Sequence, residues 1–150
     1  MSAVARAAVI ALVEGVTPTV DLRARFRCVA NGHGGGTTPL DAATNARAFD
    51  LTGGLPVDTK IASAAPSQWA ERWTLRIQYP SPPTLDPGAV ANQIAADLRA
   101  IHRVLAVPGN WVAVLDTLDA RGDPRIESVQ GGAAVRVLIP ISVTYQEAGT

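Results

Sequence analysis

The segment ERWTLRIQYPSPPTLDPGAVANQIAADLRAIHRVL, residues 71–105, carries the clearest structural signals in the chain. Its first part alternates between apolar and polar residues, which is typical of a strand that is covered on one side only. The apolar positions are Trp73, Leu75, Ile77 and Tyr79. Several prolines end this strand, and Asp86 followed by Pro87 predicts the N-cap and first residue of a helix.

The second part of the segment predicts an amphipathic helix that stops at Pro108 and Gly109. Its continuous apolar stripe is formed by Val90, Ile94, Leu98, Ile101 and Leu105. The polar residues expected to face solvent are Asn92, Gln93, Asp97, Arg99 and Arg103. A strand packed on a helix is thus the expected centre of the fold.

A first helix is predicted over residues 3–14, capped by Ser2 and stopped by Gly15. One face of it contains Val4, Ala7, Ala8, Ala11 and Leu12 at helical spacing. Val9, Ile10 and Val13 widen the apolar arc well beyond one stripe. We expect this helix to be covered on more than one side, within the fold or by another subunit.

Alternating patterns predict further strands over residues 25–30, 47–51, 111–118, 125–129 and 134–146. The glycine-rich stretch between the first two suggests a hairpin with a long projecting loop. Pro140 cannot donate a ladder hydrogen bond, so we expect an edge position or a bulge there. Residues 1–150 are therefore predicted to form a single α+β domain: a mostly antiparallel sheet with two main helices packed on one face.

The composition argues against several classes of protein. The net charge is zero, with 13 basic and 13 acidic residues, so no overall field attracts nucleic acid or anionic lipid. A single cysteine, Cys28, excludes an internal disulfide, and no apolar run is long enough for a membrane span. Only 17% of the residues are charged. A surface with few charges tolerates burial against neighbouring subunits. A coding bias toward Ala, Gly and Val would also lower the fraction of charged residues.

No catalytic, metal or cofactor site is predicted, and we do not expect an enzyme. His33, His102 and Cys28 lack metal-ligand spacing, and the GHGGG loop lacks the Lys-Ser/Thr ending of a phosphate loop. Four acidic residues gather near one turn but lack the order of a calcium loop. They are Asp116, Asp119, Asp123 and Glu127.

Arginines are the most informative polar feature. Arg23, Arg25 and Arg27 are spaced two apart on one strand face, near Arg47 on the expected partner strand. Aligned like charges repel one another unless solvent screens them or an opposite charge neutralises them. In one interpretation this arginine face is solvated. In the other it contacts acidic residues of a neighbouring subunit or DNA that passes nearby. We assign these four arginines to an inter-subunit or lumen-facing surface. Loop contacts are assigned to His33, Gly34, Gly35 and Gly36.

The order of elements resembles the tail terminator proteins of tailed bacteriophages and gene transfer agents. The resemblance rests on WTLRIQYP, VANQIAADLRAIHRVL and RVLIPISVTYQE, together with the first helix and the long loop. It implies a structural virion protein without cofactors that acts at the head-proximal end of the tail, after assembly in the host cytoplasm. It also implies a homo-oligomer, a hexameric ring that ends tube polymerisation. The implied partners are the tail tube protein, the head–tail connector proteins and DNA in the lumen, with no membrane.

Two alternatives remain open from the sequence. One is a head–tail adaptor, a stopper or a minor tail protein, which would also be a structural component of a virion. The other is a small metal-dependent enzyme or ligand-binding domain with its site among the acidic residues 116–127.

Overall fold

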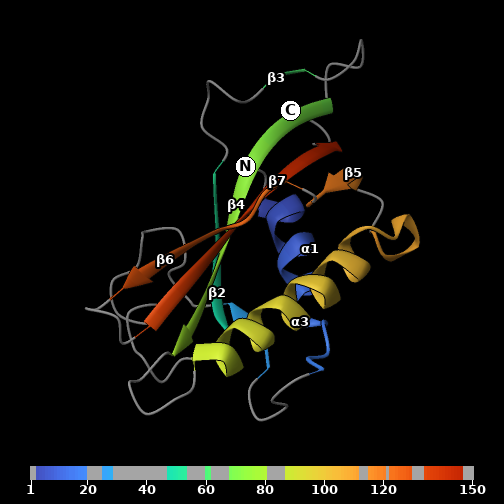
Figure 1. The fold of residues 1–150 in the computed structure, drawn as a ribbon. Helices are drawn as coiled ribbons and strands as arrows, with labels where there is room; N and C mark the ends of the chain where they lie inside the picture. The colour runs from blue at the N-terminus through green and yellow to red at the C-terminus, as the bar shows by residue number, and fades with distance from the viewer. Residues whose placement is uncertain are drawn as a thin grey trace.

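The computed structural model describes residues 3–19, 25–28, 47–53, 60–61, 68–80, 87–111, 115–120, 122–129 and 134–146. These residues form an α+β fold in which two helices lie against a curled, mostly antiparallel sheet shaped like half a barrel (Figure 1). The predicted fold class is therefore confirmed. No helix in the described ranges is long and apolar enough to cross a membrane.

The helices are α1 (Ala3–Glu14) and α3 (Pro87–Leu105), followed by a short 3-10 helix, η3 (Pro108–Asn110). The strands are β1 (Arg27–Cys28), β2 (Ala48–Gly53), β3 (Lys60–Ile61), β4 (Gln68–Pro80), β5 (Leu115–Asp119), β6 (Arg125–Val129) and β7 (Ala134–Gln146). The strand order is β1-β2-β4-β7-β5, with β3 on β4 and β6 on β7.

The sheet is built on β4 and β7, which pair antiparallel from Gln68 opposite Gln146 to Pro80 opposite Ala134. Every described pairing is antiparallel except that of β1 with β2, where Arg27 lies opposite Ala48 in a parallel ladder. The predicted hairpin is wrong, because the two strands of a hairpin must run antiparallel. The loop that joins them lies outside the described residues.

The core lies between the helices and the inner face of the sheet (Figure 1). The apolar stripe of α3 is confirmed, with Leu98 as its least buried member. The predicted boundaries of β6 and β7 are also confirmed, and one face of β7 is apolar and buried from Val137 to Tyr145. Long segments with one apolar face were therefore predicted correctly.

Helix α1 has the predicted boundaries but packs with a different face. Ala5, Val9 and Val13 are fully buried, whereas Val4 is 65% exposed and Ala7 is exposed as well. On a helix that is apolar nearly all round, the periodicity cannot select which face meets the core.

Pro140 lies in an interior strand, so the expected edge position is wrong. Its neighbour on one side is Thr74 of β4. On the other side β7 changes partner, since the β6 ladder ends at Leu138 and the β5 ladder begins at Ser142. Pro140 occupies the gap between these ladders, where its missing N–H costs no hydrogen bond. Of the predicted strand 111–118, Trp111 belongs to the C-cap of η3, residues 112–114 lie outside the described residues, and β5 runs from Leu115 to Asp119.

Candidate functional site

The structure separates the arginines that the sequence placed on one surface. Arg25 and Arg27 are exposed. Arg47 is 0% exposed, so its assignment to an inter-subunit or lumen-facing surface is wrong. The remaining predicted contacts lie outside the described residues. They are Arg23, His33, Gly34, Gly35 and Gly36.

Arg47 is held inside the protein by a carboxylate of α3. Its Nε donates to Oδ2 of Asp97 at 2.7 Å and its terminal nitrogen donates to Oδ1 at 3.0 Å. Its guanidinium carbon lies 5.6 Å from the ring centroid of Phe26. Both charged side chains are fully buried. Asp97 was expected to face solvent, and this expectation is wrong because Arg47 compensates its charge within the core.

Tyr79 of β4 completes this cluster. Its hydroxyl donates to Oδ2 of Asp97 at 2.8 Å. Burial raises the pKa of Tyr79 well above its usual value, and the negative charge of Asp97 raises it further. The cluster of Arg47, Tyr79 and Asp97 joins the start of β2, the end of β4 and the middle of α3. It fixes the position of α3 on the sheet.

We expect Tyr79→Phe to lower the free energy of unfolding by about 1–3 kcal/mol at neutral pH, since it removes a buried hydrogen bond. It should also change the pH dependence. The raised pKa keeps Tyr79 protonated in the folded protein, so its stabilising contribution is present below the unfolded pKa of about 10 and is lost above it. Urea unfolding between pH 8 and 11 should show a shallower alkaline loss for the variant. An alkaline slope equal to that of the wild type would contradict this role.

A second buried cluster lies toward the other end of β4. The indole Nε1 of Trp73 donates to Oε1 of Glu71 at 3.1 Å, and the hydroxyl of Tyr145 donates to the other carboxylate oxygen. The rings of Trp73 and Tyr145 are 6.1 Å apart between centroids. These bonds satisfy a carboxylate that is only 3% exposed and connect β4 to β7.

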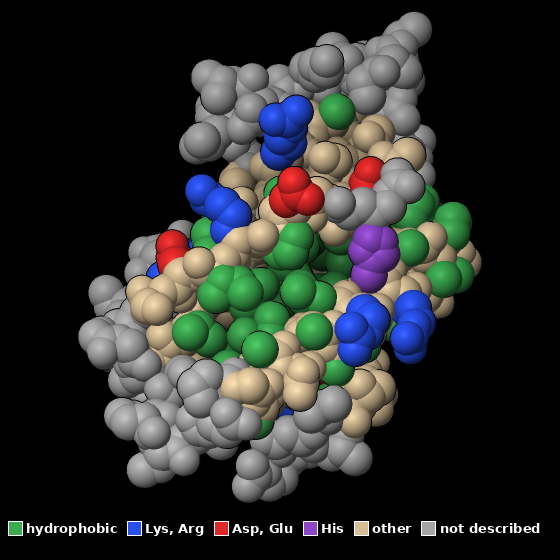
Figure 2. All heavy atoms as spheres, in the orientation of Figure 1, with side chains coloured by type: hydrophobic (Ala, Val, Ile, Leu, Met, Phe, Trp, Pro, Cys, Tyr) green, Lys and Arg blue, Asp and Glu red, His purple; other side chains and the backbone are tan. Residues whose placement is uncertain are grey.

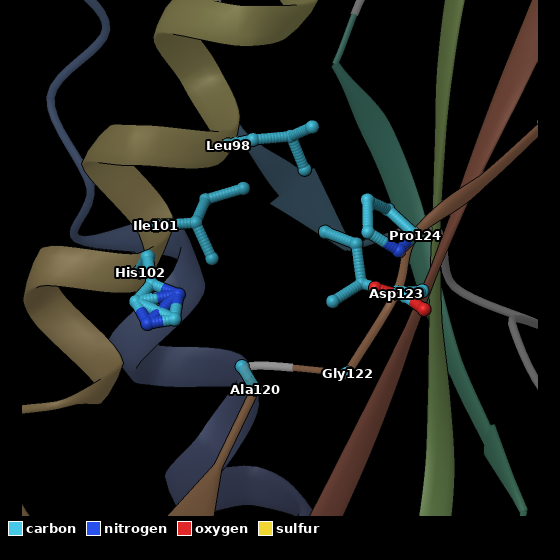
Figure 3. Close-up of a pocket in the computed structure, with 8 residues that line it drawn as sticks. Leu98, Ile101, His102, Ala120, Gly122, Asp123 and Pro124 are labelled. Atoms are coloured by element: carbon cyan, nitrogen blue, oxygen red, sulfur yellow. The ribbon is translucent and has the colours of Figure 1, made fainter.

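An open groove lies between α3 and the connection from β5 to β6 (Figure 3). It encloses about 190 Å³ and has an apolar floor that includes Leu98, Ile101 and Ile139. A neighbouring hollow of about 250 Å³ shares His102 with it. Figure 2 shows hydrophobic side chains gathered on this face of the molecule, with basic side chains beside them.

The groove and the neighbouring hollow each contain one of the acidic residues singled out in the sequence. Asp123 lines it and Asp119 lines the neighbouring hollow, each with His102. Across the described ranges, no group of three or more His, Cys, Asp or Glu side chains is placed to hold a metal ion. The arrangement fits a contact surface with an apolar floor and charged margins.

Gly122 explains the shape of the groove wall. A Cβ atom on Gly122 would lie 2.6 Å from Cγ of Pro140, well inside the normal contact distance. Glycine thus lets the β5–β6 connection lie directly on the proline ring, in the gap between the two ladders of β7. This contact was not predicted, because the sequence indicated a turn near Gly122 and a proline at position 140 but not that they meet.

No protein-family model matches this chain, and no curated protein is significantly similar to it.

Proposed function

We propose that this protein is a structural virion component, a tail terminator that forms a homohexameric ring at the head-proximal end of the tail tube. The ring would stop tube polymerisation and present a surface to the head connector. The observation that carries the proposal is the exposed apolar side of α1. The other support is the order of elements, which resembles that of tail terminators.

The outer side of α1 is suited to contact with another protein. Val4, Ala7 and Ala11 are exposed at spacings of three and four residues, and they form one continuous face. The only charged residues of α1 are bonded within the subunit: Arg6 Nε donates to the carbonyl of Leu51, and Glu14 accepts the N–H of Cys28. Glu14 is exposed and stands at the C-terminal end of this face, three residues after Ala11. Between Val4 and Ala11 the face contains no charge, so covering this part with a partner would remove apolar area from water.

A ring needs two different surfaces on each subunit, because a head-to-tail contact joins unlike patches. The outer face of α1 is one candidate. The groove beside α3 is the other, with its apolar floor and charged margins. Arg25 and Arg27 are exposed, and we keep both as proposed contacts with an acidic neighbour or with DNA.

The first test places a charge on the α1 face. The Ala7→Glu/Ala11→Glu variant should remain folded but lose ring formation, since two carboxylates would be buried in an apolar contact. Native mass spectrometry would report the ring, and the length of tails assembled in the presence of the variant would report its function. We expect at least a tenfold loss of ring and tails of uncontrolled length.

Ala89→Glu/Ala91→Glu provides the matched control, because it makes the same two changes at exposed alanines of α3. It should leave both measurements unchanged. If the α1 variant assembled normally and terminated tails normally, the proposal for α1 would be refuted. Recovery of the wild-type protein on heads that lack tails would instead favour a head–tail adaptor or stopper.

A further inference from the structure

Strand β6 forms an open margin of the sheet. It pairs with β7, from Arg125 opposite Leu138 to Val129 opposite Ala134, and with no other described strand. Residues 125–128 are all exposed, and Ile126 is 60% exposed. Figure 1 shows β6 on the left of the sheet, on the side opposite to β5 and to the C-terminal end of α3. An edge of this kind presents N–H and C=O groups that another strand can bond.

The margins of the sheet at β1 and at β6 differ in protection. At β1, the N–H of Cys28 already donates to the carboxylate of Glu14 at 3.1 Å, so a side chain of α1 covers that edge. Natural edge strands are often protected by proline, lysine or a bulge. β6 contains neither proline nor lysine, and its ladder with β7 is continuous.

We propose that β6 pairs antiparallel with β6 of a second copy, around a two-fold axis at Ile126. This axis is perpendicular to the joined sheet, so the inner faces of both copies lie on the same side. Residues opposite each other in the pair must then point to the same face, and this holds only if one residue pairs with its own copy at the centre. With Ile126 at the centre, Arg125 of each copy lies opposite Glu127 of the other. Centres at Arg125 or Glu127 would place like charges opposite each other, which is unfavourable.

The surroundings of β6 support this register. Glu127 lies 3.5 Å from Arg136 of β7 in its own subunit, so pairing would place its carboxylate between two guanidinium groups. The two Ile126 side chains, on the face opposite to that of Arg125 and Glu127, would cover each other. The β6–β6 contact is two-fold and does not depend on the proposed ring. If both form, the β6–β6 contact would join two head-to-tail rings face to face.

Charge reversal tests the register directly. Arg125→Glu and Glu127→Arg each place like charges opposite each other in the self-pair, and each should weaken self-association by roughly tenfold or more. An equimolar mixture of the two variants pairs opposite charges again and should restore association. Analytical ultracentrifugation would measure all three samples and the wild type. Association of either single variant at the wild-type level, or failure of the mixture to associate, would overturn the proposal.

A cross-linking experiment tests the position of the axis, in a Cys28→Ser background so that no other thiol competes. Ile126→Cys places two thiols at the axis and should give a disulfide-linked dimer on a non-reducing gel. Ser128→Cys is the matched control on the same face of β6. Its copies would be four residue positions apart along the strand, roughly 13 Å, which is too far for a disulfide. Equal cross-linking of both variants, or of neither, would overturn the register.

Discussion

Replacing Asp97 by alanine is expected to destabilise the protein by about 3–5 kcal/mol, which is a large part of the stability of a domain of this size. The change leaves Arg47 charged and fully buried without its bidentate partner. It also removes the acceptor of the Tyr79 hydroxyl. The cost thus combines an uncompensated buried charge with an unsatisfied buried donor.

Urea unfolding of purified variants would measure this loss. Arg99→Ala is the matched control on the exposed side of the same helix, and it should change stability by about 0.5 kcal/mol or less. A combined Arg47→Met/Asp97→Leu variant should recover most of the loss, because apolar residues of similar size remove the charges together. A loss below about 1 kcal/mol for Asp97→Ala would show that the ion pair does not anchor α3.

The second large effect is expected for Gly53→Ala, at the end of β2. Gly53 has a φ of 132°, where residues with a side chain are strained by about 1–3 kcal/mol. A Cβ atom there would lie 2.6 Å from the carbonyl oxygen of Arg72 and 2.7 Å from the Cα of Trp73. Both contacts are with backbone of the central strand β4, so neither is relieved by a rotamer change. We expect a total loss of at least about 3 kcal/mol from strain and overpacking together.

Gly109→Ala provides the comparison for Gly53→Ala in thermal unfolding. A Cβ on Gly109 would have no atom within 4 Å, and the residue lies in the exposed η3 segment. Its substitution should therefore shift the melting temperature little. If the two glycine variants unfolded at the same temperature, the close approach of β2 to β4 at Gly53 would not be a constraint on the fold.

Long segments with one clear period could be predicted from the sequence. The boundaries of α1, β6 and β7 were correct, as was the start of α3 at Pro87. For α3 and β7 the local pattern and the tertiary burial agree, so neighbouring residues contain the information that is needed.

The buried charges could not be placed in the same way. Asp97 was assigned to solvent because it is charged, yet it lies three residues after Ile94 and four before Ile101, within the buried arc of α3. The position of Asp97 between these two apolar residues was the available indication that it is buried. Its partner, Arg47, is distant in sequence, and a pairing over that separation has no local signature. The parallel pairing of β1 and β2 was missed for a similar reason, since strand patterns contain no direction.

Pro140 also has a consequence for how the fold opens. Because it splits the outer edge of β7 into two ladders, β6 is held by its own five residue pairs and does not share them with β5. Short, solvent-exposed ladders open at a lower free energy than the core, often as separate cooperative units. β6 can therefore detach and return while β4, β5 and β7 stay intact, so fast amide exchange in β6 would report local opening and not global unfolding.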